Sequence, residues 1–422
     1  MRWPDHAIWW HAYPLGFVGA SPGGTPPRSR LGRFTGWLDH LLELGCNGIT
    51  LGPVFASETH GYDTVDHYRV DPRLGDEDDL RRLIDAASRK GVRVLLDGVF
   101  NHVGRGFPQF ADVAAKGDGS PYRKWFHADL RTFEGHDRLV TLNHAEPEVA
   151  AYVTDVMTHW LERGIDGWRL DAAYAVPPEF WRPVVDRVRV RFPDAWFVGE
   201  VIHGDYAALV ERTGLDSVTQ YELWKAIWSS LNDRNFFEVA HALGRHDEML
   251  DTFVPQTFLG NHDVTRIASR LDDARHMAHA LVILLTVGGV PSIYAGDEFA
   301  FQGVKEEREG GDDAIRPAFP DRPSETPGHG QAHHRLHQEL IGLRRRHPWL
   351  VHARTTVDTL TNTALSYTVG HGANRLAVVL NIDDEPAKVD LPDAAWTCAA
   401  GDAAFSEAGV TVPPAGWAIA EP

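Results

Sequence analysis

Four acidic residues stand out because each one closes an apolar run that is typical of a buried strand. The four segments are Val94-Leu-Leu-Asp97, Gly167-Trp-Arg-Leu-Asp171, Phe197-Val-Gly-Glu200 and Phe258-Leu-Gly-Asn-His-Asp263. Acids at the carboxyl ends of parallel strands meet at one rim of a barrel, where catalytic groups sit. Hydrolysis of a glycosidic bond needs one carboxylic acid to protonate the leaving oxygen and a second carboxylate at the anomeric carbon. These acids are therefore candidates for that chemistry.

Polar residues beside these acids could assist them. Arg169 and Asp171 are two positions apart, so on a strand they share one side, and we expect Arg169 to keep Asp171 ionised as a nucleophile requires. His262 precedes Asp263, and His102 could donate to a sugar hydroxyl. A single acid at a strand end is often only a helix cap or a loop contact. Four of them in this context favour a functional site.

Strand and helix patterns alternate along the chain between these acids. The segments that read as buried strands are 7–13, 47–51, 92–97, 165–170, 195–200, 216–219, 252–259 and 290–294. Helical patterns lie between most of them. Eight such units favour a closed barrel over a doubly wound sheet.

Two segments interrupt this alternation. Residues 103–142 have no clear periodicity, and a loop of that length inside a domain is usually functional. After a predicted helix over 332–346 the pattern changes to alternating apolar and polar residues. We predict an α/β fold: a (β/α)8 TIM barrel over 1–348, a short insertion (domain B, 103–142) after the third strand, and a small C-terminal all-β domain, a β-sandwich, over 349–422.

Composition limits the partners and the location of the protein. Its 422 residues carry a formal net charge of −18, which disfavours nucleic acid and anionic lipid as partners. Neither a signal peptide nor a run of eighteen apolar residues is recognisable, so no membrane association is predicted. Cys46 and Cys398 lie in segments of different character and are predicted to be free thiols in a reduced cytoplasm.

The four acidic segments together resemble the four core motifs of the α-amylase family, glycoside hydrolase family 13, and the resemblance extends over nearly the whole chain. It implies that Asp171 is the nucleophile, Glu200 the general acid/base and Asp263 the group that stabilises the transition state. Anomeric configuration would be retained through a covalent glycosyl-enzyme intermediate.

The resemblance also implies residues that bind the sugar. Arg169, His102 and His262 would hold the ring in subsite −1. Tyr62, in the segment His60-Gly-Tyr-Asp63, matches an aromatic residue that stacks on that ring. Asp97 would be structural and hold the Arg169 region in place.

Two further segments, 215–223 and 310–317, resemble the cyclomaltodextrinase and neopullulanase branch of the family. In the second segment Asp312 and Arg316 match a pair that binds the sugar on the non-reducing side, although the basic residue that often follows the arginine is absent. The resemblance implies a hydrolase of α-1,4-glucosidic bonds in small α-glucans, meaning short or cyclic maltooligosaccharides such as cyclic maltosyl-maltose. A transglycosylase or isomerase with the same catalytic residues is the alternative, and a homodimer is allowed.

A non-catalytic glycan-binding module is disfavoured because all three catalytic acids are present. Rim tryptophans are candidates for the plus-side subsites, namely Trp9, Trp10, Trp125 and Trp224.

No metal or other cofactor is predicted to be required. Asn101 is the kind of residue that ligates calcium in many amylases, but the Lys-His pair that usually follows the nucleophile is replaced here by Tyr174-Ala. Calcium is therefore allowed but not expected. His333 and His337 have the spacing of a zinc-chelating pair on a helix, but no carboxylate or Cys completes the set nearby, so a solvent-exposed helix face is predicted.

Overall fold

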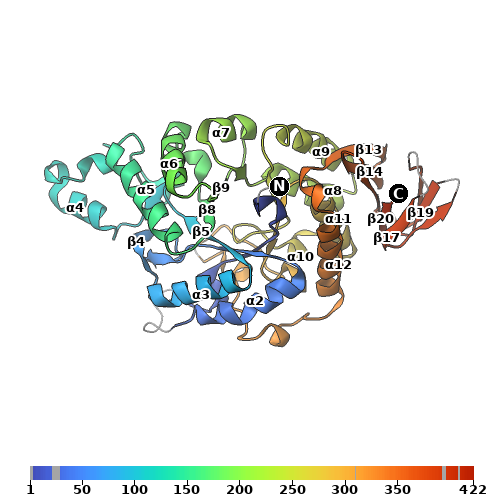
Figure 1. The fold of residues 1–422 in the computed structure, drawn as a ribbon, viewed down its shortest axis with the longest axis horizontal. Coiled ribbons are helices and arrows are strands. Elements are labelled where there is room, and N and C mark those ends of the chain that lie inside the picture. The colour runs from blue at the N-terminus through green and yellow to red at the C-terminus, as the bar shows by residue number, and fades with distance from the viewer. Residues whose placement is uncertain (1–2, 21–28, 309, 392–395, 407–408) are drawn as a thin grey trace.

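A barrel of eight parallel strands forms the centre of the molecule (Figure 1). The computed structural model describes residues 3–20, 29–308, 310–391, 396–406 and 409–422. In spatial order the strands are β10 (Ser217–Val218), β9 (Trp196–Gly199), β8 (Gly167–Leu170), β5 (Arg93–Gly98), β2 (Gly48–Leu51), β1 (Trp9–Ala12), β12 (Val290–Tyr294) and β11 (Gln256–Phe258). A parallel bridge between Thr219 and Gln256 joins the two ends of this order. The predicted (β/α)8 barrel is confirmed.

Helices cover the outside of the barrel between successive strands. They include α2 (Gly32–Leu44), α3 (Glu77–Arg89), α5 (Pro147–Leu161), α6 (Pro178–Arg191), α7 (Tyr206–Thr213), α8 (Tyr221–Asn232), α9 (Phe237–Met249), α11 (Met277–Thr286) and α12 (Ala332–Arg346). The start of α3 shows why such helices begin where they do. Asp76 accepts from the Asp79 amide and Asp79 from the Asp76 amide, so two otherwise unpaired N–H groups are satisfied.

Adjacent residues of β1 pack on opposite sides of the strand. Trp9 points into the barrel, where its ring stacks on that of Trp196 at 5.5 Å, whereas Trp10 points outwards and stacks on Trp37 of α2 at 5.9 Å. Both are fully buried. The expectation that Trp9 and Trp10 lie at the rim is therefore wrong, because side chains alternate between the two faces of a strand and both faces of a barrel are covered.

The segment after the third barrel strand forms an extension at one end of the molecule, where Figure 1 labels α4 (Pro108–Lys116). Its ends are joined by an antiparallel pair, β6 (His102–Val103) with β7 (Val140–Thr141). A second antiparallel pair, β3 (Phe55–Ser57) with β4 (Thr64–Val70), follows β2. Trp125 is buried inside the extension and donates to Glu148 Oε2 over 2.8 Å, so the expectation that it lies in a plus-side subsite is wrong.

The chain after α12 forms antiparallel sheets at the opposite end of the molecule (Figure 1). One sheet has the order β13 (Arg354–Leu360), β14 (Ala364–His371), β15 (Asn374–Asn381), β20 (Trp417–Glu421) and β17 (Thr397–Gly401). The other has β16 (Ala387–Val389), β19 (Gly409–Val412) and β18 (Ala404–Ser406). The predicted C-terminal all-β region is confirmed, while the exact domain limits stay a prediction. The hydroxyls of Thr286 in α11 and Tyr367 in β14 lie 2.7 Å apart and tie the sheet to the barrel.

The two cysteines are free thiols, as predicted: Cys46 is buried and Cys398 is exposed. In the described part of the chain, no helix combines the length and the apolar character needed to cross a bilayer.

The histidine face of α12 was expected to be exposed to solvent, and for His337 this expectation is wrong. Its side chain is buried and its Nδ1 contacts the His333 carbonyl oxygen at 2.9 Å. The helix packs that face onto the barrel.

Candidate active site

Arg169 lies at the centre of the acidic rim. Its Nη1 is 2.6 Å from Asp97 Oδ2 and 3.5 Å from Asp171 Oδ1, and its Nη2 is 2.7 Å from Glu200 Oε1. These residues come from the ends of β5, β8 and β9, which are neighbours in the barrel, and Asp97 is directly in register with Arg169. All four side chains are less than one tenth exposed. The barrel therefore brings three of the predicted acids onto one guanidinium group.

The ionisation of Asp171 differs from the expectation. Burial, followed by the charges of Glu200 and Asp97, raises the pKa of Asp171 well above its ordinary value, and the opposing effect of Arg169 is smaller. Arg169 lies closer to Asp97 and Glu200 than to Asp171. The expectation that Arg169 keeps Asp171 ionised is thus corrected, because the guanidinium is shared among three carboxylates.

Glu200 is held by two groups besides Arg169. Its Oε2 accepts from the Ala172 amide at 3.1 Å, and its Oε1 accepts from the Tyr221 hydroxyl at 3.3 Å. Ala172 has φ 45°, a left-handed backbone that is costly for a residue with a Cβ and is typical of functional sites. Asn261 Nδ2 donates to the same hydroxyl at 2.7 Å. Tyr221 was missed as a site residue, although it stands just after a predicted strand, where rim residues are expected.

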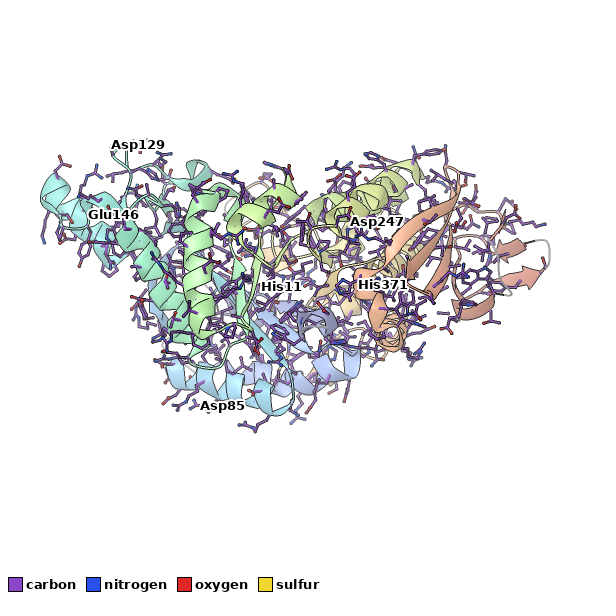
Figure 2. All side chains as sticks on the ribbon, turned by 45° about the horizontal axis from the view of Figure 1, so that its top comes forward. His11, Asp85, Asp129, Glu146, Asp247 and His371 are labelled. Atoms are coloured by element: carbon purple, nitrogen blue, oxygen red, sulfur yellow. The ribbon has the colours of Figure 1, made fainter. Side chains whose placement is uncertain are left out.

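His262 connects Asp263 to the rest of the rim. Its Nε2 is 2.9 Å from Asp263 Oδ2 and also contacts the Tyr62 hydroxyl, which donates to Asp97 Oδ2 over 3.3 Å. The His11 ring packs edge-on to His262 at 5.1 Å, and Figure 2 shows His11 near the middle of the molecule. Although burial opposes it, His262, Arg316 and Arg169 together hold the pKa of Asp263 well below its ordinary value. The four predicted acids thus form one connected site.

Arg316 reaches the site from the segment that follows β12. Its Nη2 lies 2.8 Å from Asp263 Oδ1 and 2.9 Å from Asp312 Oδ2, and its Nε donates to the His262 carbonyl oxygen at 2.8 Å. The guanidinium lies over the Tyr13 ring, 4.6 Å from its centroid. Sequence reasoning placed Arg316 with Asp312 but missed its bond to Asp263 and the contribution of Tyr13, because both depend on how distant loops fold over the rim.

His102 marks the side of the site that faces the insertion. Its Nε2 is buried without a partner among the described residues, and burial lowers the pKa of His102 to about 3. The ring stacks on Phe133 of the insertion at 4.9 Å. Next to Phe133, Glu134 accepts from the Tyr174 hydroxyl at 2.7 Å. The insertion therefore contributes one wall beside the acids of the rim, and the binding of a sugar hydroxyl by His102 stays a prediction.

Asn101 contacts two neighbouring groups of the protein. Its Nδ2 lies 3.1 Å from His102 Nδ1 and its carbonyl oxygen accepts from the Leu142 amide at 3.0 Å. Calcium takes six to eight oxygen ligands, which can include backbone carbonyls. That calcium is not required stays a prediction, and no step of the reaction proposed below uses it.

Of the four tryptophans predicted to lie in plus-side subsites, Trp224 alone is partly exposed. Its indole N–H donates to the Leu259 carbonyl at 3.0 Å, and its ring packs edge-on to Tyr221 at 5.7 Å. Its role in a plus-side subsite stays a prediction.

Comparison with known proteins identifies the family. The family model described as "Alpha amylase, catalytic domain" matches residues 30–137 and 130–350. The chain belongs to the α-amylase family.

Relatives agree with the branch suggested by the sequence. A cyclomaltodextrinase of Bacillus sp is 36% identical over 287 residues, which are 63% of this chain and 51% of that protein. The chain thus spans about half the length of that relative. The solved cyclic α-maltosyl-(1→6)-maltose hydrolase of Arthrobacter globiformis superposes with a TM-score of 0.84 at 25% identity and full coverage of both chains. A debranching enzyme of Nostoc punctiforme, soaked with acarbose, gives 0.83 at 26% identity, covering 100% of this chain and 99% of the other.

Proposed function

We propose that the protein is a retaining glycoside hydrolase that cleaves α-1,4-glucosidic bonds in short or cyclic maltooligosaccharides. The observation that carries this proposal is the shared contact of Arg169 with Asp97, Asp171 and Glu200. It brings a nucleophile and a proton donor together at the rim where barrel enzymes carry out catalysis.

In the proposed reaction Glu200 protonates the glycosidic oxygen while the carboxylate of Asp171 attacks the anomeric carbon. The negative charge of Glu200 is one cause of the raised pKa of Asp171, so a protonated Glu200 favours the ionised Asp171 that this step needs. The bond to the leaving sugar breaks and a covalent glycosyl-enzyme forms. Glu200, now a carboxylate, takes a proton from water, and the water oxygen displaces Asp171. Arg169 contacts both carboxyl groups, so its charge stabilises the negative charge on Asp171 before the glycosyl-enzyme forms and on Glu200 afterwards. Two inversions retain the anomeric configuration.

The remaining rim residues are proposed to bind the sugar that is cleaved. His102, His262 and Tyr62 surround subsite −1, and Asp263 stabilises the positive charge that develops on the ring. Asp312 and Arg316 are proposed to bind on the non-reducing side. The similarity to a cyclomaltodextrinase and to a cyclic α-maltosyl-(1→6)-maltose hydrolase supports short or cyclic substrates.

The proposal extends to where the protein acts and to its oligomeric state. We infer that the protein acts in the cytoplasm on a soluble α-glucan, which is consistent with two free thiols and a net charge of −18. A homodimer stays a prediction.

The test is a panel of substrates followed by proton NMR. Purified protein is incubated separately with maltotriose, cyclomaltodextrins, cyclic maltosyl-maltose, pullulan and starch. Rapid release of α-anomers from small or cyclic substrates, with starch almost untouched, is the expected result. Longer or rearranged products would move the protein to the transglycosylases or isomerases, and selective loss of α-1,6 bonds from pullulan would make it a debranching enzyme. No turnover of any substrate would overturn the proposed activity.

A further inference from the structure

Three histidines form a cluster outside the barrel, where α2 and α12 pack against each other. His40 comes from α2, His329 from the segment before α12, and His334 from the first turn of α12. One ring nitrogen of each lies within 4.8 Å of the other two. Among the described residues no other set of three His, Cys, Asp or Glu side chains brings its ligand atoms as close. Imidazole nitrogens are preferred ligands of zinc and similar transition metals.

Glu298 orients the first of these histidines. It lies in η7 (Asp297–Phe299), is fully buried, and its Oε1 is 3.0 Å from His40 Nε2. The same oxygen accepts from Trp10 Nε1 at 3.1 Å, and Oε2 accepts from the Gly296 amide at 2.8 Å. A carboxylate that receives one N–H of a histidine leaves the other ring nitrogen with a lone pair, which is the usual arrangement behind a metal-binding histidine.

Two nitrogens of the cluster are buried without partners among the described residues, His40 Nδ1 and His334 Nε2. Buried polar atoms normally have partners, so these two nitrogens are candidate ligand atoms.

We propose that His40, His329 and His334 form a structural zinc site. Ligands at about 2.0–2.1 Å from a tetrahedral ion stand about 3.4 Å apart, so the rings draw together by up to about an ångström and a half when the ion binds. His334 Nδ1 accepts from the Gly330 amide at 3.1 Å. Ligation through Nε2 moves the ring hydrogen to Nδ1, so the Gly330 peptide must turn. Gly330 has open space around it and φ +69°, which allows this rotation.

The position of the site suggests what zinc would do. Glu298 precedes and His329 follows the segment 299–328, which carries Asp312 and Arg316 to the acidic rim. Zinc would bind His329 at one end of this segment and His40 of α2, and His40 in turn contacts Glu298 at the other end. The proposal concerns the stability of this region and does not depend on the activity proposed above.

The test measures zinc binding directly on tag-free protein that has been treated with a chelator and dialysed. Zinc chloride is titrated by calorimetry, bound metal is counted by mass spectrometry, and cobalt is used as a spectroscopic substitute. We expect one zinc ion per chain, a rise in Tm, and cobalt absorption bands typical of tetrahedral nitrogen ligation.

Variants locate the ion. His329→Gln, at a half-buried position, and His334→Gln should each weaken zinc binding at least about tenfold and abolish the rise in Tm. His333→Gln, on the same helix but outside the cluster, should bind as the unaltered protein does. The proposal is overturned if the unaltered protein retains no zinc, or if both cluster variants bind it normally. It is also overturned if binding is lost in Asp171→Asn instead, since the ion would then lie at the acidic rim.

Discussion

Arg316 donates from Nη2 to Oδ1 of Asp263 across 2.8 Å, although 53 residues separate the two in the chain. The same guanidinium donates from Nε to the carbonyl oxygen of His262. Arg316 lies in the segment that follows β12. Two of its N–H donors therefore bind two consecutive residues, His262 and Asp263, in the loop after β11. Because the fork of a guanidinium matches this geometry and an ammonium does not, the arginine acts on both the position and the charge of Asp263.

Replacing Arg316 should impair catalysis more than folding. In Arg316→Lys one point charge replaces the fork, and Asp263 loses its fixed position, so we expect kcat/KM to fall about 10²-fold. The pKa of Asp263 should rise because the lysine ammonium does not keep the close contact that the guanidinium makes with this carboxylate. Steady-state kinetics on maltotriose measure the effect, with the exposed Arg322→Gln as control. Equal kinetics in Arg316→Lys and Arg322→Gln would contradict the role given to Arg316.

The two proposed catalytic acids can be separated by the choice of leaving group. Asp171→Asn and Glu200→Gln should each lower kcat on maltotriose by at least about 10³-fold while Tm stays within a few degrees. Fluoride leaves without protonation, so Glu200→Gln should still form the glycosyl-enzyme from α-glucosyl fluoride, whereas Asp171→Asn should not. Rapid quenching and mass spectrometry of the protein detect this intermediate. Near-normal turnover of maltotriose in either variant would refute the assignment.

The insertion is fastened beside the site by the bond between Tyr174 and Glu134. Removing the hydroxyl in Tyr174→Phe should loosen this wall, and we expect KM for maltotriose to rise about threefold to tenfold with kcat little changed. Glu134→Gln keeps an acceptor oxygen and should show a smaller effect. Steady-state kinetics of Tyr174→Phe and Glu134→Gln give the two KM values to compare. A fall in kcat with KM unchanged would show that Tyr174 acts on the catalytic step instead.

Buried histidines should make the fold sensitive to acid. Burial lowers the pKa of His67 to about 4, and the unfolded chain has the ordinary value near 6.5. Between these values the unfolded state binds the extra proton, so stability is present above about pH 6.5 and is lost as pH falls towards 4, by about 1.4 kcal/mol per pH unit for each such group. Burial lowers the pKa of other histidines to about 4 as well, among them His144, His246 and His279.

Denaturant unfolding at several pH values measures this slope. His67→Gln should reduce the proton uptake on unfolding by about one, because it removes one titrating group from the interior. His371→Gln, at an exposed position of β14 labelled in Figure 2, should leave the slope unchanged. An identical slope in all three proteins would show that His67 is charged in the folded state.

Calcium should have no effect on this protein. The Lys-His pair that usually completes the calcium site is replaced here by Tyr174-Ala, and the Asn101 carbonyl oxygen already accepts from the Leu142 amide. Adding calcium to chelator-treated protein should therefore change neither kcat/KM nor Tm, whether or not zinc is also present. A rise in Tm that follows the calcium concentration and is lost in Asn101→Ala would contradict this prediction.

Much of the barrel could be predicted from local patterns. Asp97, Asp171, Glu200 and Asp263 each follow an apolar run, and in a parallel barrel the ends of all strands point to one rim, so their convergence follows from the chain order. The helix over 332–346 was predicted with the limits that the structure shows for α12. Trp9 and Trp10 were wrongly predicted to lie at the rim. Both faces of their strand are buried, so no alternation of polar and apolar residues indicates which way each side chain points.

The sequence did not predict how one arginine is shared among several carboxylates, nor which residues from distant segments come into contact. The pair Arg169 and Asp171 was expected from its spacing, but the guanidinium lies closer to Asp97 and Glu200 because neighbouring strands supply those acids in register. Likewise Arg316 meets Asp263, and His334 meets His40, only after the segment 299–328 folds back onto the barrel. Hydrophobic periodicity is a local property that a single chain displays, whereas side-chain contacts between remote loops depend on the packing of the whole molecule.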